Sequence, residues 1–190
     1  DWKVGKHILE DVYTFEDALV VGCLLNSLLK HCDRVKVACL AQLVNVIAPI
    51  MTEDGGPSWA QTIYWPFYYA SKYGRGEVLD IRLDVPSYEN NRYGEVPYAD
   101  AVLVYHEEEQ ELDLFVINRS LHEDIELDLD AVGFSGQLKL IEHITLHHRD
   151  LKAVNEKNNP ENIKPVVKSE IMDTFIAPRQ SWNLFRFSIS

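Results

Sequence analysis

The sequence has few cysteines, and none of them has a spacing typical of a metal or redox site. Its 190 residues include Cys23, Cys32 and Cys39, with no Cys-x-x-Cys pair. An odd number without such a pair is typical of reduced thiols in a reducing compartment. Because Cys23 and Cys39 lie within apolar runs, we expect both to be buried and inert. The sequence therefore predicts a cytoplasmic protein.

Basic residues and ligand-binding motifs are also scarce. Lysine and arginine number 18 against 30 aspartates and glutamates, which gives a net charge of −12. Phosphate contacts need clustered basic residues, so we expect neither nucleic acid nor an anionic membrane as a partner. No apolar run is long and uncharged enough to span a bilayer. A phosphate loop, a nucleophile elbow and a zinc signature are all absent, so we expect no cofactor and no metal.

The most informative stretch that is present is an almost unbroken apolar run from Val35 to Val46. Such a run is typical of a strand that is covered on both faces in a parallel sheet. After a polar loop, an aromatic pattern predicts a helix from Trp59 to Tyr73. Ligand-binding groups gather at the carboxyl ends of strands in βα units. We therefore place Gln42 and Asn45, near the end of the predicted strand, close to a ligand.

A helical pattern precedes this strand, and strand patterns follow the second helix. Thr14 and Asp17 form an acidic capping box, and the helix runs to about Lys30; it is apolar on most sides, so we expect burial on most sides. Beyond residue 77 comes an extended run to Pro86, and then a turn-rich link, Ser87 to Pro97. Short strands follow at 98–105, 111–118, 125–129, 138–147, 163–167, 174–177 and 181–189. Short strands separated by turns favour an antiparallel sandwich.

The chain thus changes class near residue 77, which divides it into residues 1–77 and residues 78–190. A lone parallel-type strand would have no ladder partner, so it would self-associate or be disordered. Either the strand pairs with another chain, or the sequence is the tail of a larger α/β protein. The unmatched strand favours the second interpretation, and a start at Asp1 rather than methionine agrees with it.

The stretch LEDVYTFEDALVVGCLLNSLLKHCDRVKVACLAQLVNVIAPIMTEDGGPSWAQTIYWPFYYASKYGRG resembles the end of the barrel in family 51 glycoside hydrolases, the intracellular α-L-arabinofuranosidases. Three later segments, VPYADAVLVYHEEEQELDLFVINR, IEHITLHHRDLKAVN and APRQSWNLFRF, are similar to that family's C-terminal β-sandwich. The resemblance implies a mixed α/β plus all-β chain. Residues 1–77 would end a (β/α)8 barrel with helix, strand and helix, and residues 78–190 would form a jelly-roll-like antiparallel sandwich. We also expect a homo-oligomer.

The resemblance implies a retaining enzyme that removes terminal non-reducing α-L-arabinofuranosyl residues from arabinan or arabinoxylan oligosaccharides. Such an enzyme needs two carboxylates about 5 Å apart. In the family both are glutamates on earlier barrel strands, so this chain should contain no catalytic residue and be inactive alone. The resemblance also implies that Gln42 binds sugar, since an amide can donate to and accept from hydroxyls. The alternative is a buried glutamine that is bonded to backbone.

Asn45 and Trp59 are further, weaker substrate-binding candidates, since a tryptophan that opens a core helix is more often packed than bound to a sugar. His143 and His147 could form a metal pair on one strand face, but a solvated face is the commoner arrangement. The glutamates at 107–109 and 111 indicate a charged hairpin turn, and Glu53 with Asp54 lie together in one loop. The alternative function is a non-catalytic β-sandwich module for carbohydrate binding or subunit interaction.

Overall fold

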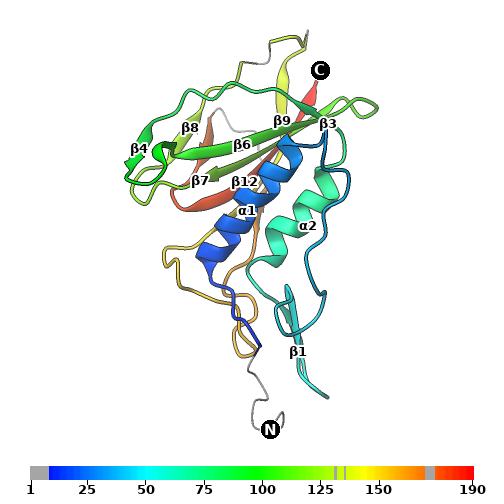
Figure 1. The fold of residues 1–190 in the computed structure, drawn as a ribbon. Coiled ribbons are helices and arrows are strands. Elements are labelled where there is room, and N and C mark those ends of the chain that lie inside the picture. Colours follow the sequence, from blue (N-terminus) through cyan, green and yellow to red (C-terminus); the bar gives the residue numbers. More distant parts are fainter. Residues whose placement is uncertain (1–8, 131, 135, 170–173) are drawn as a thin grey trace.

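The computed structural model of the chain describes residues 9–130, 132–134, 136–169 and 174–190, which form a mostly-sheet fold with two helices (Figure 1). The helices are α1 (Phe15–Lys30) and α2 (Tyr64–Tyr73). The strands are β1 (Ile50–Thr52), β2 (Ser58–Ala60), β3 (Glu77–Leu79), β4 (Ser87–Asn90), β5 (Gly94–Pro97), β6 (Ala99–His106), β7 (Glu111–Asn118), β8 (Ile125–Leu127), β9 (Leu138–His147), β10 (Val166–Lys168), β11 (Phe175–Ala177) and β12 (Ser181–Ile189).

The centre of the fold is a six-stranded antiparallel sheet in the order β10-β9-β12-β7-β6-β3. β12 lies between β9 and β7 and pairs with both along almost its whole length. Because successive side chains of a strand point to opposite faces, Trp182 and Leu184 enter one core cluster while Phe185 and Phe187 enter another. The sheet therefore has a core on each side.

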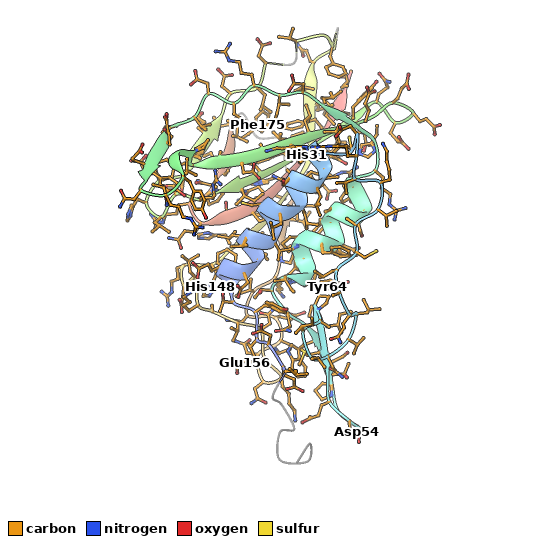
Figure 2. The ribbon with its side chains drawn as sticks, viewed as in Figure 1. His31, Asp54, Tyr64, His148, Glu156 and Phe175 are labelled. Atoms are coloured by element: carbon orange, nitrogen blue, oxygen red, sulfur yellow. The ribbon has the colours of Figure 1, made fainter. Side chains whose placement is uncertain are left out.

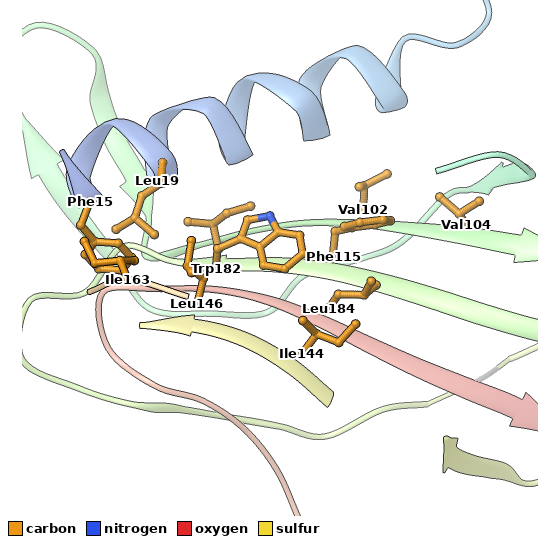
Figure 3. Packing of buried hydrophobic residues seen from close by; sticks show 12 residues of the cluster. Phe15, Leu19, Val102, Val104, Phe115, Ile144, Leu146, Ile163, Trp182 and Leu184 are labelled. Carbon is orange, nitrogen blue, oxygen red and sulfur yellow. The ribbon is translucent and has the colours of Figure 1, made fainter. Parts of the chain in front are cut away.

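The two helices cover one face of this sheet (Figure 1). Phe15 and Leu19 of α1 pack with Phe115, Leu146 and Trp182 of the strands (Figure 3). The predicted capping box begins the helix: the Thr14 N–H donates to Asp17 Oδ2 at 2.7 Å, and the Asp17 N–H donates to Thr14 Oγ1 at 3.4 Å. These two bonds satisfy amides that the first turn leaves without helical partners.

The opposite face packs against the small β8–β11 sheet and the segment around Ile81. Aromatic side chains dominate this second core, where the Phe175 ring meets the Phe187 ring edge to face at 5.1 Å between centroids. A cavity of about 630 Å³ remains between the layers, and it is lined mainly by apolar residues, with acidic residues among its lining. Neither helix of the described ranges is long and apolar enough to cross a membrane.

The strand predicted from Val35 to Val46 is wrong for this chain. These residues form irregular structure apart from one parallel bridge between Val44 and Ile50, and they are largely exposed; the exposed fraction is 80% at Val37 and 69% at Leu43. A strand needs ladder partners for its amides and carbonyls, and the described parts of the chain offer this segment one only at Val44.

The second helix was predicted to begin too early. It begins at Tyr64, because Ser58–Ala60 pairs with Ile50–Thr52 in a hairpin. Pro66 marks this start in the sequence, since proline fits the first turn of a helix but not its interior. The predicted link from Ser87 to Pro97 is likewise a hairpin, formed by β4 and β5.

Two burial predictions also need correction. The face of α1 that points away from the sheet is exposed, with exposed fractions of 53% at Val20 and 59% at Leu24, so the helix is buried on one side only. Cys39 is exposed because the strand expected to bury it does not form, whereas Cys23 is partly buried against the helix-side core.

The predicted strands 111–118, 138–147 and 181–189 are confirmed to the residue, and 98–105 is confirmed within one residue at each end. The strand predicted at 174–177 is also confirmed within one residue, as β11. The other two were predicted less closely: β8 ends two residues early, and β10 is displaced toward the C-terminus. The glutamates at 107–109 lie in the turn between β6 and β7, as predicted.

Candidate functional site

The three predicted substrate-binding residues lie in or beside the hairpin that projects from the lower end of the molecule in Figure 1. Gln42 and Asn45 lie in the segment that leads into β1, and Trp59 lies on β2, where it pairs with Met51. Gln42 is exposed, and its Oε1 accepts a long hydrogen bond of 3.4 Å from the Ile47 N–H. Its side chain is therefore held in place by little more than this one contact.

Asn45 is much more firmly held than Gln42. Its N–H donates to the Ile50 carbonyl at 2.8 Å, its Oδ1 accepts from the Thr52 N–H at 2.7 Å, and its Nδ2 donates to Thr52 Oγ1 at 2.9 Å. These bonds fold residues 45–52 back on themselves. Asn45, Gln42 and Val46 all have positive φ, at 61°, 57° and 60°. For the β-branched Val46 this is a strained conformation.

A group of buried polar side chains joins this segment to the start of α1, and we call Gln61 and Thr62 the polar clamp. Gln61 is 1% exposed; its Oε1 accepts from the Tyr13 N–H at 3.0 Å, and its Nε2 donates to the carbonyls of Ala48 at 2.9 Å and Asp11 at 3.2 Å. Thr62 Oγ1 lies 3.0 Å from the Tyr13 carbonyl and 2.6 Å from the Thr14 carbonyl.

Further bonds between the same two segments reinforce the clamp. The Gln61 N–H donates to the Pro49 carbonyl at 2.8 Å, and the Asp11 N–H donates to the Val46 carbonyl at 2.9 Å. The Tyr13 hydroxyl donates to the Ile47 carbonyl at 2.9 Å. Residues 46–49 are thus tied to residues 11–14 by both backbone and side chains.

A second buried amide, Asn155, links its own loop to Ala60 at the end of β2. Its Nδ2 donates to the carbonyls of Ala60 at 3.0 Å and Ile163 at 2.9 Å, and its Oδ1 accepts from the Ile163 N–H at 2.8 Å. The same loop supplies the Ala153 carbonyl, which accepts from the Phe15 N–H at 2.8 Å. The first turn of α1 is therefore satisfied by a loop far away in the sequence.

The carboxylates near Gln42 and Asn45 do not form a catalytic pair. Glu53 and Asp54 lie in the turn between β1 and β2, and Figure 2 shows Asp54 at its tip. Glu53 forms an ion pair with Lys157. Two adjacent side chains at the tip of one hairpin cannot approach a glycosidic bond from opposite sides, which is the arrangement that a retaining mechanism needs.

The histidine pair does not form a metal site. His143 is 4% exposed and stacked on Phe185 with 4.0 Å between ring centroids, and its Nε2 lies 3.0 Å from Asn183 Oδ1. Burial lowers the pKa of His143. The predicted solvated face is therefore wrong for His143 and holds for the exposed His147. Over the described ranges, no group of three or more histidine, cysteine, aspartate or glutamate residues could hold a metal.

Gln61, Thr62 and Asn155 were not predicted as site residues from the sequence. A signal for the first two was present, since they are the polar pair inside the otherwise apolar and aromatic stretch WAQTIYW. Asn155 gave no comparable signal, because its partners lie 95 residues upstream and 8 residues downstream.

Comparison with known proteins identifies the family. A family model described as "Alpha-L-arabinofuranosidase C-terminal domain" matches residues 2–181. The chain is 47% identical over 190 residues to the intracellular exo-alpha-(1->5)-L-arabinofuranosidase of Acetivibrio thermocellus. The aligned region covers 97% of this chain and 38% of that protein. The chain is 46% identical over 191 residues to intracellular exo-alpha-(1->5)-L-arabinofuranosidase 1 of Bacillus subtilis, with coverage of 97% and 37%.

Solved structures agree with this result. A family 51 alpha-L-arabinofuranosidase from Bifidobacterium longum superposes with a TM-score of 0.87 and 38% identity, over 96% of this chain and 35% of that one. The enzyme from Thermotoga petrophila, at 22% identity and a TM-score of 0.81, shows the same fold. The chain spans little more than a third of these relatives' length. Through its match over residues 2–181, and as the resemblance predicted, this chain belongs to the α-L-arabinofuranosidase C-terminal domain family.

Proposed function

We propose that this chain is the C-terminal portion of a retaining α-L-arabinofuranosidase, which removes terminal non-reducing α-L-arabinofuranosyl residues from oligosaccharides of arabinan or arabinoxylan. Residues 1–77 would complete its (β/α)8 barrel, and residues 78–190 would form its C-terminal β-sandwich. The catalytic glutamates would lie outside this chain. The names of the curated relatives support the activity and a cytoplasmic location.

The observation that carries this proposal is an apolar surface that the described residues leave exposed. Val20, Leu24 and Leu28 form an exposed stripe at helical spacing on the face of α1 turned away from the sheet. Val37 and Leu43 expose apolar side chains in the following segment. Contiguous apolar surface of this kind marks an interface. The remainder of a barrel would cover both surfaces and supply ladder partners for residues 35–46.

The conformation of residues 42–46 supports the same interpretation. Three residues of this short segment, Gln42, Asn45 and Val46, have positive φ. This backbone conformation is costly for residues other than glycine, above all for the β-branched Val46. In the intact protein, hydrogen bonds to a neighbouring barrel strand on each side would stabilise an extended conformation of this segment in its place. Gln42 would then lie at the carboxyl end of a barrel strand, where ligand-binding groups of this fold gather. Asn45 and Trp59 would lie close to it.

The test is an assay of the purified 190-residue chain and of the intact protein on an aryl α-L-arabinofuranoside. We expect turnover by the intact protein and none by the 190-residue chain, because the chain lacks a pair of carboxylates on opposite sides of a sugar. Turnover by the shorter chain within a factor of ten of the intact protein would show that the catalytic pair lies inside this sequence.

The role of Gln42 is tested in the intact protein. A hydrogen bond that strengthens in the transition state is worth roughly 2–4 kcal/mol, so Gln42→Ala should lower kcat/KM by one to a few powers of ten. Its melting temperature should change little. A large loss of stability with normal turnover of the folded fraction would show instead that Gln42 is a structural residue.

A further inference from the structure

We infer that Gln61 is a positioning residue for the substrate site: it holds residues 46–49, and through them the segment carrying Gln42 and Asn45, at a fixed place relative to the start of α1. This inference rests on the proposed function. It assigns a role to a residue that would not itself touch the sugar.

The geometry of Gln61 is that of a side chain with all its polar groups engaged. Both oxygen and nitrogen of its amide are paired with backbone groups from two segments, residues 11–13 and residue 48, and its own N–H is paired with residue 49. At 1% exposure it has no water to substitute for these partners. A buried polar group with every bond made fixes one arrangement of its neighbours, because any displacement leaves donors or acceptors unpaired.

The segment that Gln61 holds has few other restraints within the described residues, where residues 35–44 pair only through the Val44 bridge and Gln42 is exposed. In the intact protein, the barrel proposed above would add ladder partners to residues 35–46, and Gln61 would fix the residues that follow this strand. The last fixed point before the β1–β2 hairpin is therefore the stretch 46–49. Misplacement of a binding group by about 1 Å can lower a rate by on the order of a hundredfold. Release of this fixed point would act on catalysis through the position of Gln42.

The substitution that tests this role is Gln61→Glu in the intact protein. Glutamate has the same shape, but it loses the two donors and places a carboxyl group against the carbonyls of Asp11 and Ala48. The matched control is Asn155→Asp. It makes the same chemical change at an equally buried amide, which also bridges two carbonyls, but those belong to Ala60 and Ile163 rather than to residues 46–49.

Both variants should lose stability, so the readout is kcat and KM of the folded protein on an aryl α-L-arabinofuranoside. We expect Gln61→Glu to lower kcat/KM about tenfold to a hundredfold, and Asn155→Asp to lower it less than threefold. Gln61→Glu and Gln42→Ala should be strongly non-additive in the double variant, because the first acts through the second. Equal losses of kcat/KM in Gln61→Glu and Asn155→Asp would overturn the inference. Additive effects of Gln61→Glu and Gln42→Ala in the double variant would also overturn it.

A milder variant covers the case in which Gln61→Glu does not fold. Tyr13→Phe removes only the hydroxyl that donates to the Ile47 carbonyl, and it should lower kcat/KM severalfold with little change in melting temperature. Wild-type kinetics with Tyr13→Phe would then count against the inference. Absence of turnover by the unmodified intact protein would overturn the proposed function and the inference together. If Gln42→Ala lowers kcat/KM as expected but Tyr13→Phe and Gln61→Glu do not, the inference alone is overturned.

Discussion

Gly22 of α1 lies directly against the indole of Trp182: a Cβ added at Gly22 would be 2.7 Å from Trp182 Cδ1. It would also lie 3.2 Å from Ile117 Cγ1. Trp182 is almost fully buried and stacks on Tyr69 of α2 at 5.6 Å between ring centroids, so it has no room to move. This glycine sets the distance between helix and sheet, and it explains why α1 tolerates a residue that weakens helices.

Gly22→Ala should therefore destabilise the chain although alanine is the better helix former. Overpacking a well-filled core costs about 1–3 kcal/mol, against about 1 kcal/mol gained in helix propensity. The control is Ser27→Ala on the exposed side of α1, which should be neutral or slightly stabilising. Thermal unfolding of both variants measures the difference. A gain of stability in Gly22→Ala as large as in Ser27→Ala would show that the contact with Trp182 is not tight.

The three thiols should separate into one slow and two fast groups in the purified 190-residue chain. Burial, with the Asp100 charge adding to it, raises the pKa of Cys23 to about 11, so very little thiolate forms at pH 8. Cys32 and Cys39 are exposed and should react with a thiol reagent rapidly. Cys23→Ala should leave the fast phase unchanged. In the intact protein Cys39 should join the slow group, if a barrel covers its segment as proposed.

Acid should destabilise the chain through His143. Its folded-state pKa lies below its usual value, so the unfolded chain binds the proton more tightly and stability falls as pH drops from about 7 through the unfolded pKa of about 6.5. The loss continues until the lowered folded pKa is reached. Each tenfold difference in proton affinity between the two states is worth about 1.4 kcal/mol.

The contribution of His143 can be isolated by comparing two variants at pH 7.5 and pH 5. His143→Gln should show a smaller change in melting temperature between these values than the unmodified chain, because it removes the titrating group. His147→Gln replaces an exposed histidine of the same strand and is the matched control. Identical profiles for all three proteins would show that His143 does not contribute to acid sensitivity.

Arg186 should be among the residues whose loss is most costly. It forms ion pairs with Asp113 at 3.0 Å, Glu142 at 2.7 Å and Glu111 at 2.5 Å, and its guanidinium lies 4.1 Å from the centre of the Tyr73 ring. Asp113 is fully buried, so Arg186→Met would leave its carboxylate with His106 as its one remaining charged partner among the described residues. Breaking a buried pair in this way costs about 3–5 kcal/mol. Denaturant unfolding, with Arg92→Met at an exposed turn as the control, measures this cost.

The sequence by itself determined the elements whose signals are local. The capping box at Thr14 and Asp17 predicted the start of α1, and Leu112, Leu114 and Val116, which share one strand face, predicted a central strand to the residue. These signals depend on neighbours within a few positions, so they survive whatever the rest of the protein does. The resemblance identified the family and singled out Gln42, because a motif can be matched without any knowledge of contacts.

Only the tertiary structure decided what depends on distant partners. Residues 35–46 have the composition of a buried strand, but a strand forms only where neighbouring strands accept its hydrogen bonds, and the part of the chain that the structure describes does not provide such neighbours. The contacts of the polar clamp could not be predicted from residue spacing either. Gln61 bonds to Tyr13 and Asp11, which precede it by 48 and 50 positions, and these residues meet only in the folded chain. Burial of His143, and the contact that requires Gly22, follow from the packing of whole layers rather than from any local pattern.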